Sequence, residues 1–355
     1  MTVDRAVARL LFFGFDGHRL DAQARRLLAA GAGGVILFRR NVRDAEQVRA
    51  LIDAIRQAAA GPVLVAVDQE GGRVARLRGI TTDLPPMRQV RSVDDARSVG
   101  AVLGRELSAL GFDLNFAPVV DVDTNPANPV IGDRSFSRDP EVVARLAAAL
   151  IEAMQEQGVA ACAKHFPGHG DTEADSHHAL PVLRHGPERL AQVELLPFRA
   201  AVEAGVASVM TAHLLLPALD PETPATGSKA VLSLLRDGLG FDGLTVSDDL
   251  EMKAIAGHHA VPEFAVRAVR AGVDQVLVCH RARLQWAVLE ALDEAVQRDP
   301  KVASRVEEAG RRIETVWRRF GARPRKPAAL RSPDALALAR RLGAPPAGAD
   351  PTGDR

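Results

Sequence analysis

The sequence predicts one domain of the α/β class, a single (β/α)8 barrel of the TIM type, and three observations support this prediction. Short apolar runs recur eight times between residues 10 and 278. The segments between most of these runs repeat apolar residues with helical spacing, and such alternation of strand and helix is typical of a parallel barrel. Polar residues follow most of the runs, where the active sites of such barrels lie. A barrel takes about 250 residues, so this chain is long enough for one.

Each apolar run is expected to form a strand, because short continuous apolar runs are typical of parallel strands that are buried on both faces. In chain order the expected strands are residues 10–13, 34–38, 63–67, 114–120, 159–163, 208–211, 244–246 and 275–278. Helices are expected after most of them, at residues 44–60, 93–110, 140–157, 187–204, 229–239 and 261–271.

The composition divides the chain into two parts. Residues 1–320 are expected to form the catalytic barrel, and residues 321–355, rich in Pro, Ala and Arg, a C-terminal tail. One short helix is expected in this tail, at residues 333–342. A segment of this composition buries too little apolar surface to fold independently, so the rest of the tail is expected to be mobile.

Charge and composition exclude several classes of partner. The 45 basic and 45 acidic residues cancel, so neither nucleic acid nor an anionic membrane is an expected partner. No apolar run approaches the length of a membrane span, and no signal peptide is visible, so the expected location is the cytoplasm. Cys162 and Cys279 lie in separate expected strands and are interpreted as reduced core thiols. A monomer without a cofactor, acting on a small neutral or zwitterionic substrate, is expected.

Five of the expected strands end in polar residues. These are Asp68-Gln69-Glu70-Gly71-Gly72-Arg73, Asp121-Val122-Asp123, Lys164-His165, His213 and Ser247-Asp248-Asp249. Any one of these clusters is also explained by a salt-bridged surface loop. Lys164 stands out, because the chain has only five lysines against forty arginines.

The segment from Lys164 to His177 has the densest chemistry of the chain, with one lysine, three histidines and three acids in fourteen residues. Asp175 stands two residues before His177, so its carboxylate can bond one ring nitrogen and leave the other for proton transfer. The pair is interpreted as an acid/base dyad. The alternatives are a polar surface loop and a metal site built on His165 and His169.

At the end of the seventh expected strand, Asp248 is the candidate nucleophile, since a carboxylate held by a strand suits attack on an anomeric carbon. Its neighbour Asp249 supports it or caps a helix, and spacing alone does not decide between the two. Around the same mouth, charged donors and acceptors suit the hydroxyls of a sugar. The candidate binding residues are Asp68, Arg76, Arg134, Lys164 and His165.

A metal-dependent barrel hydrolase is the main rival, since such barrels also collect His, Lys and Asp at strand ends. Those sites usually take a His-x-His pair from an early strand. The first expected strand here is followed by His18 with no second histidine near it. Asp121 and Asp123 could bind magnesium, but this spacing without a phosphate-binding loop is weak evidence. No metal is therefore expected.

Several segments between about Leu10 and Leu277 resemble the family 3 glycoside hydrolases, and within them the bacterial β-N-acetylhexosaminidases. They are residues 33–38 (GGVILF), 65–74 (VAVDQEGGRV), 116–122 (FAPVVDV), 131–136 (IGDRSF), 164–177 (KHFPGHGDTEADSH) and 247–250 (SDDL). Among these segments, the 164–177 signature is the most specific.

This resemblance implies a role for each candidate residue. Asp248 would be the nucleophile of a retaining exo-enzyme that forms a glycosyl-aspartate, His177 the proton donor and acceptor, and Asp175 the residue that orients it. The five binding residues named above would hold the GlcNAc ring.

The resemblance also implies a substrate. It would be GlcNAc linked to 1,6-anhydroMurNAc-peptides, in the recycling of peptidoglycan. Phosphorolysis in place of hydrolysis remains an alternative. His178 is expected to be an exposed side chain without a role.

Overall fold

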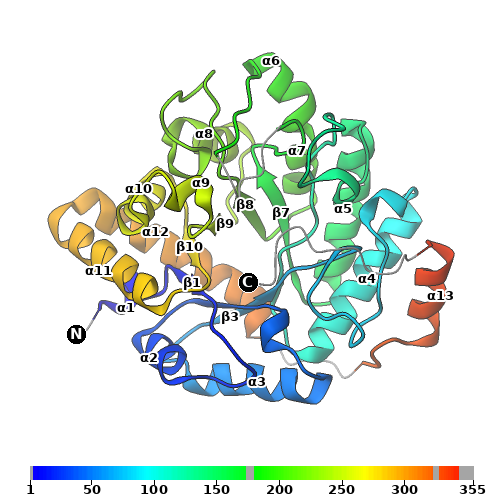
Figure 1. The fold of residues 1–355 in the computed structure, drawn as a ribbon, viewed down its shortest axis with the longest axis horizontal. Helices are drawn as coiled ribbons and strands as arrows, with labels where there is room; N and C mark the ends of the chain where they lie inside the picture. The colour runs from blue at the N-terminus through cyan, green and yellow to red at the C-terminus, as the bar shows by residue number, and fades with distance from the viewer. Residues whose placement is uncertain (1–2, 173–179, 323–327, 344–355) are drawn as a thin grey trace.

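The computed structural model describes residues 3–172, 180–322 and 328–343. Within these residues, eight parallel strands form a closed barrel in the order β1-β10-β9-β8-β7-β6-β3-β2, surrounded by helices (Figure 1). The predicted fold class is confirmed. The barrel strands are β1 Leu11–Phe13, β2 Gly34–Leu37, β3 Leu64–Val67, β6 Leu114–Asn115, β7 Ala160–Phe166, β8 Ser208–Thr211, β9 Leu244–Asp249 and β10 Gln275–Val278.

The α-helices cover the outside of the barrel. They are α1 Arg5–Ala8, α2 Ala22–Ala30, α3 Ala45–Ala58, α4 Val93–Leu110, α5 Pro140–Glu156, α6 Pro187–Arg189, α7 Leu196–Glu203, α8 Lys229–Ser233, α9 Lys253–Ala256, α10 Val261–Ala271, α11 Ala282–Arg298, α12 Pro300–Val316 and α13 Pro333–Arg341. Single π-helical turns follow α6, α8 and α12, at Leu190–Glu194, Leu234–Gly238 and Trp317–Gly321. Short 3-10 turns occupy Arg39–Asn41, Met87–Gln89, Gly132–Arg134 and Ala225–Gly227.

Local signals explain why α4 has the bounds that its sequence predicts. The Ser92 side chain caps its first turn by accepting a hydrogen bond from the Asp95 N–H at 3.1 Å. Two acidic residues in this turn complement the helix dipole. The helix ends at Gly111, whose φ of 104° is a left-handed conformation that glycine adopts without steric cost.

The core lies inside the barrel and between the barrel and its helices. Phe12 and Phe116 meet inside the barrel with ring centroids 5.5 Å apart. On β2, Gly34 leaves room for the Phe12 ring, which an added Cβ would overlap. On α4, Gly100 and Gly104 let α5 approach closely, because a Cβ at either position would meet a backbone carbonyl of α5.

Three strand predictions were wrong in their bounds. The seventh expected strand, 244–246, continues as β9 to Asp249. The fourth expected strand, 114–120, pairs as a regular strand only at Leu114–Asn115, since Pro118 has no N–H for the ladder. Val119 then makes a single bridge to Lys164. The fifth expected strand is longer than predicted, because β7 extends to Phe166 and includes Lys164 and His165.

Some elements were not predicted. Helices α2, α11 and α12 complete the outer ring, and a hairpin of β4 Gln69–Gly71 and β5 Val74–Ala75 follows β3. Among the described residues, three peptide bonds are cis, namely Ala117–Pro118, Phe166–Pro167 and Lys164–His165.

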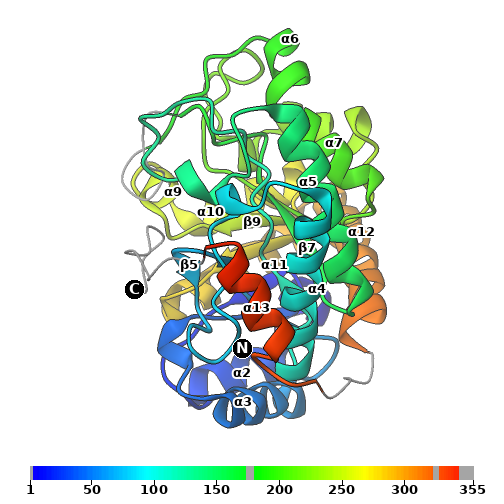
Figure 2. The ribbon, with the colours of Figure 1, turned by 90° about the vertical axis from the view of Figure 1, so that its right-hand side faces the viewer.

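The segment after residue 320 contains the expected short helix. Figure 2 shows this helix, α13, lying along α4. It buries Ala335, Leu338 and Ala339, and Arg341 forms an ion pair with Asp95 of α4 at 2.6 Å. The division of the chain near residue 320 remains an expectation.

Candidate active site

A group of four charged side chains lies at the carboxyl-terminal mouth of the barrel. Lys164 of β7 donates to Asp68 at 2.8 Å and lies 2.6 Å from a Glu70 oxygen. Arg134 grips Glu70 with two hydrogen bonds of 2.8 Å each. The side chains of Lys164, Glu70 and Arg134 are almost completely buried, and Asp68 is the more exposed member at 16%. We call Asp68, Glu70, Arg134 and Lys164 the charged quartet.

The quartet balances two negative charges against two positive charges. Burial alone would raise the pKa of Glu70, but Arg134 and Lys164 outweigh it and hold that pKa below its ordinary range. Burial likewise would lower the pKa of Lys164, and Asp68 and Glu70 reverse this effect, so that pKa is raised. Glu70 and Lys164 therefore stay ionised at neutral pH, which fixes them as rigid partners of Asp68 and Arg134.

His165 is held by Asp121, which follows the fourth expected strand. The Nδ1 atom of His165 lies 2.7 Å from an Asp121 oxygen, and its backbone N–H donates to the same carboxylate. The His169 N–H donates to Asp121 as well, at 2.7 Å. On its other side the His165 ring reaches Arg134, with 3.5 Å between Nε2 and Nη2. Asp121 thus orients the imidazole beside the quartet.

A register shift in β7 explains how consecutive residues both face the mouth. Ala163 pairs with Val209 and Phe166 with Thr211, so β7 carries one residue more than β8 between these pairs. In a regular strand, Lys164 and His165 would point to opposite faces. The irregularity re-aims one side chain, as bulges beside active sites often do.

Asp248 lies at a similar irregularity in β9. Val246 pairs with Gln275 and Asp249 with Leu277, which again leaves one extra residue in β9. The Asp249 N–H donates to the Asp248 carboxylate at 2.8 Å, and Asp248 is half-buried. Burial lowers the pKa of His213, and the nearby Asp248 carboxylate offsets this only in part. The His213 ring also lies 3.1 Å from the Asp249 carbonyl, so Asp248 and His213 lie at the same mouth.

The structure decides what Asp249 does. One of its carboxylate oxygens accepts from the Cys279 N–H of the segment after β10 and from the Glu251 N–H, and the other lies 3.2 Å from His280. Asp249 thus ties the ends of β9 and β10 together. It supports its neighbour Asp248 by fixing the strand end.

Arg76 lies on the turn after β5 and is 2% exposed. Its backbone N–H donates to the Asp68 carbonyl at 3.4 Å, and its guanidinium lies 5.8 Å from the centroid of the Phe38 ring. The Arg40 guanidinium also lies over the Phe38 ring, 4.3 Å from its centroid.

Asp175 and His177 lie outside the described residues, as does His178. The last described residues before them are firmly held. Asp171 accepts from the Thr124 hydroxyl at 2.6 Å and lies 2.6 Å from the His185 ring. The Asn128 amide donates to the His169 carbonyl at 2.8 Å.

Comparison with known proteins identifies the family. Residues 2–316 match the family described as glycosyl hydrolase family 3, N terminal domain. The chain belongs to glycosyl hydrolase family 3. A β-hexosaminidase of Thiobacillus denitrificans is 46% identical over 283 residues, which are 77% of this chain and 78% of that relative.

Two solved structures are similar to this chain in fold and in sequence. The β-N-acetylglucosaminidase of Paenibacillus sp. str. FPU-7 has a TM-score of 0.91 at 41% identity, over 96% of this chain and 68% of that chain. NagZ from Neisseria gonorrhoeae, in complex with N-trifluoroacetyl-D-glucosamine, has a TM-score of 0.75 at 35% identity, over 94% of this chain and 97% of that chain. The predictions of a family 3 glycoside hydrolase and of a likeness to the β-N-acetylhexosaminidases are confirmed.

Two of the residues that raised the metal alternative have other partners. Asp123 pairs with Arg88 at 2.7 Å, and His169 lies 2.7 Å from the Thr172 hydroxyl. In the part of the chain that the structure describes, no group of three or more His, Cys, Asp or Glu residues is placed to hold a metal ion.

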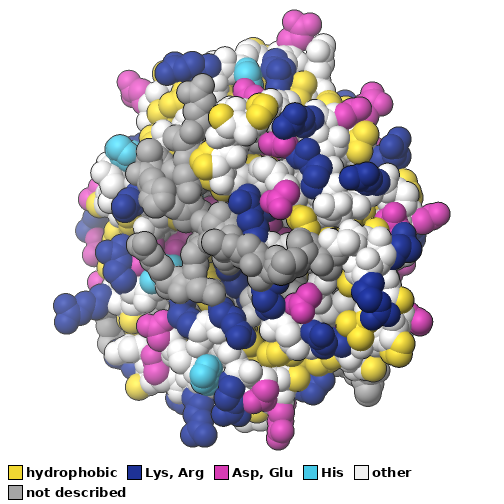
Figure 3. Space-filling view, turned by 45° about the vertical axis from the view of Figure 1, so that its right-hand side comes forward, with side chains coloured by type: hydrophobic (Ala, Val, Ile, Leu, Met, Phe, Trp, Pro, Cys, Tyr) yellow, Lys and Arg dark blue, Asp and Glu magenta, His cyan; other side chains and the backbone are white. Residues whose placement is uncertain are grey.

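Other findings bear on the general expectations. Cys162 and Cys279 are both free and buried, as predicted, and burial raises the pKa of Cys162 to about 12. Figure 3 shows a face on which basic and acidic side chains are interspersed. None of the helices in the described ranges is long and apolar enough to cross a membrane.

Sequence reasoning missed two buried carboxylates that organise the site, Glu70 and Asp121. Both stood in the polar clusters that ended expected strands, but Glu70 was assigned no role and Asp121 was considered only as a magnesium ligand. For Glu70 a signal was available, since it stands two residues after Asp68 and so can share its side of an extended chain. For Asp121 the partner backbone N–H groups come from residues 165 and 169, which no local pattern reveals.

Proposed function

We propose that this chain is a retaining exo-β-N-acetylglucosaminidase with Asp248 as its nucleophile. The observation that carries the proposal is the position of this carboxylate at the irregular end of β9, on the mouth that holds the buried charged quartet. Rigid charged groups around a carboxylate suit a sugar ring whose anomeric carbon becomes positively charged. The names of the relatives, and the N-acetylglucosamine analogue bound to NagZ from Neisseria gonorrhoeae, support the choice of sugar.

The proposed reaction has two steps. In the first, an Asp248 oxygen bonds to the anomeric carbon while the bond between this carbon and the aglycone oxygen breaks. His177 gives the aglycone oxygen a proton. In the second, water attacks the anomeric carbon, His177 takes a proton from it, and the bond to Asp248 breaks. Two inversions at one carbon retain the β configuration. Asp175 would orient the His177 ring.

The remaining site residues would hold the GlcNAc ring. An ammonium group has three donors, and two carboxylates flank that of Lys164, so its third donor can reach a substrate hydroxyl. Asp68, as the more exposed member of the quartet, can accept from hydroxyls. Arg76, Arg134 and His165 would complete the ring of donors. Their mutual contacts preorganise them before the substrate arrives.

For the natural substrate we propose GlcNAc linked to 1,6-anhydroMurNAc-peptides, from which the enzyme would release GlcNAc in peptidoglycan recycling. We propose that it acts as a monomer in the cytoplasm. The absence of an excess of basic or acidic residues fits a small glycan substrate better than a polyanion.

The experiment compares nitrophenyl β-N-acetylglucosaminide with nitrophenyl β-glucoside, in buffer with a chelator and without phosphate. We expect turnover of the first substrate alone. Activity that appears only with added phosphate, with GlcNAc-1-phosphate as product, would replace hydrolysis by phosphorolysis. Activity that the chelator abolishes would replace the proposal by a metal-dependent reaction.

A further inference from the structure

A segment of the C-terminal region contacts the turn at residues 81–83, and this turn supports the proposed sugar-binding residues. We call residues 328–343, which include α13, the C-terminal strap. The strap packs along α4, where Leu338 and Ala339 are buried. Just before α13, Arg331 has a φ of 53°, the one positive value among non-glycine residues in the described ranges. Such a conformation costs about 1 kcal/mol for a residue with a Cβ and persists only where surrounding contacts fix it.

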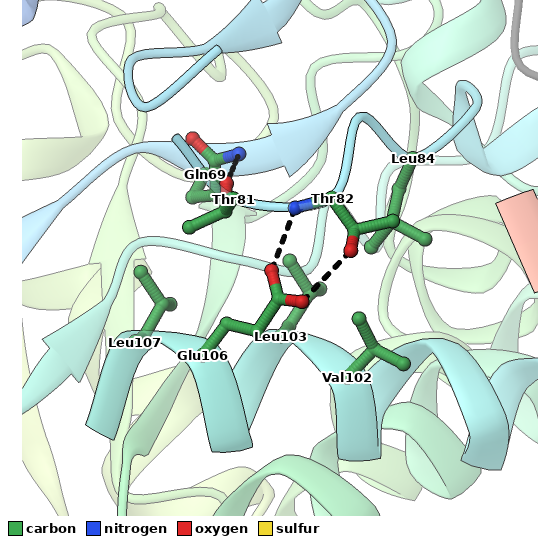
Figure 4. A pocket seen from close by; sticks show the side chains of 8 residues that line it. All are labelled: Gln69, Thr81, Thr82, Leu84, Val102, Leu103, Glu106 and Leu107. Carbon is green, nitrogen blue, oxygen red and sulfur yellow. Dashed lines mark hydrogen bonds between the residues drawn. The ribbon is translucent and has the colours of Figure 1, made fainter. Parts of the chain in front are cut away.

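Glu106 of α4 holds the strap and the sugar site together. Its carboxylate is buried and accepts three hydrogen bonds, of which Figure 4 shows the two from Thr82. Two come from the N–H and the hydroxyl of Thr82, at 2.6 and 2.7 Å, and the third from the Arg331 N–H of the strap, at 2.8 Å. A buried carboxylate needs such donors, because an unpaired one would be costly. The strap is therefore part of what fixes the turn at Thr82.

The Arg331 side chain reaches the same turn directly. Its guanidinium donates to the Thr81 carbonyl and to the Asp83 carboxylate, at 3.2 Å each. The Thr81 hydroxyl in turn accepts from the Gln69 amide at 3.1 Å, as Figure 4 shows. Thr81 thus connects the strap to Gln69, which stands between Asp68 and Glu70 of the charged quartet.

Gln69 connects Thr81 to the backbone beside Arg76. Its side-chain oxygen accepts from the Leu77 N–H at 3.0 Å, next to Arg76 in the chain. Its backbone N–H is held by the Asn115 side chain at 3.0 Å. Gln69 is 2% exposed, so a change in its position transmits to its neighbours.

We propose that Arg331 is a positioning residue for substrate binding, acting through Thr81 and Gln69 on Arg76. The inference rests on the proposed function, in which Arg76 holds the GlcNAc ring. Arg331 does not touch the substrate. It fixes the turn that aims Arg76, and its loss should weaken binding of the sugar more than it slows the chemical step.

The test uses full-length variants. Arg331→Gly removes the guanidinium, keeps the N–H that Glu106 accepts, and suits the positive φ. We expect it to raise KM for nitrophenyl β-N-acetylglucosaminide about fivefold, to raise the inhibition constant of free GlcNAc equally, and to leave kcat within about twofold. Thr81→Val, which removes the hydroxyl that accepts from Gln69 and donates to the Leu77 carbonyl, should have the same effect. Arg331→Lys should restore part of the affinity.

The matched control is Arg341→Ala, which breaks the ion pair with Asp95 at the other end of the strap. It should leave KM unchanged. In an Arg76→Ala background, which itself raises KM, adding Arg331→Gly should have no further effect, because the two residues act in series.

Three outcomes would overturn the inference. An unchanged KM in both Arg331→Gly and Thr81→Val, with a raised KM in Arg76→Ala, would refute it and leave the proposed function standing. Equal increases of KM in Arg331→Gly and Arg341→Ala would show that any weakening of the strap has this effect, whichever contact is lost. An unchanged KM in Arg76→Ala would remove Arg76 from sugar binding, and with it both that part of the proposed function and this inference.

Discussion

At the scale of single residues, the charged quartet is stable only as a whole. Glu70 accepts from Arg134 and contacts Lys164, and all three side chains are nearly inaccessible to water. Removing one charge leaves its partners buried without compensation, which usually costs more than the pair itself contributes.

We therefore expect Glu70→Gln to lower the free energy of unfolding by about 3 kcal/mol or more. The measurement is urea denaturation at neutral pH. Glu152→Gln is the matched control, because it breaks the exposed pair of Glu152 with Arg97 and should cost less than about 0.5 kcal/mol. Equal losses of stability in the two variants would contradict the claim that the buried charge of Glu70 stabilises the quartet.

Asp248→Asn should lose hydrolysis by on the order of 10³-fold or more while the fold persists, because an amide is a poor nucleophile and cannot carry the glycosyl group. Steady-state kinetics with circular dichroism would check this. Asp242→Asn provides a control at an exposed acid that precedes the same strand. Undiminished activity in the Asp248→Asn variant would remove Asp248 from the reaction.

For His177→Ala we expect a loss that depends on the leaving group. A nitrophenolate departs without a proton, whereas the alcohol of a natural disaccharide needs one. The variant should therefore lose much less activity on the nitrophenyl glycoside than on a GlcNAc disaccharide. A general acid role would be ruled out by equal losses on both substrates.

The sequence anticipated that several candidate residues would lie near one another, and the reason lies in the fold. Asp68, Lys164, His165 and Asp248 follow or end apolar strands, and a parallel barrel brings such positions to one mouth. The contacts among them were beyond prediction, because Glu70 and Asp121 acquire their roles from partners far along the chain. His177 and Asp175 remain predictions from the sequence.

At the scale of elements, most helices could be predicted because their ends are locally encoded. Ser92 and Gly111 bound α4 within its own sequence. The strands were less predictable, since their extent depends on pairing. Pro118 interrupts the ladder after β6, and the irregularities in β7 and β9 come from neighbours that no local pattern specifies.

The packing of α4 on α5 gives a prediction at this scale. Gly100→Ala should destabilise the protein by about 1 to 3 kcal/mol, because the added methyl meets the Leu150 carbonyl, which is backbone and cannot turn away. At Gly310 of α12 the added methyl meets nothing, so Gly310→Ala should stabilise by about 0.5 to 1 kcal/mol. Thermal denaturation of both variants checks the opposite signs. Changes of the same sign would contradict the packing argument.

At the scale of the whole molecule, stability should fall as the solution is acidified. Burial lowers the pKa of His169 to about 4, from an ordinary value of 6.5. Between these values the unfolded chain binds a proton that the folded protein does not, so stability rises with pH there and is fully present above about pH 6.5. His213, whose pKa burial also lowers, acts in the same direction.

We expect the free energy of unfolding to be lower at pH 5 than at pH 7 by about 2 kcal/mol from His169 alone. Urea denaturation at both pH values measures the difference. His169→Asn, although less stable at pH 7, should show a difference smaller by about that amount. An unchanged difference in the variant would mean that His169 is not the group responsible.

The balanced charges of the quartet also constrain how this site can evolve. A single substitution that alters the charge of Glu70, Arg134 or Lys164 produces a protein with an uncompensated buried ion. Descendants of this chain therefore inherit the three as one unit, and replacements among them have to arrive together. New sugar preferences would arise first at Asp68, the more exposed member, because its replacement still leaves Lys164 paired with Glu70.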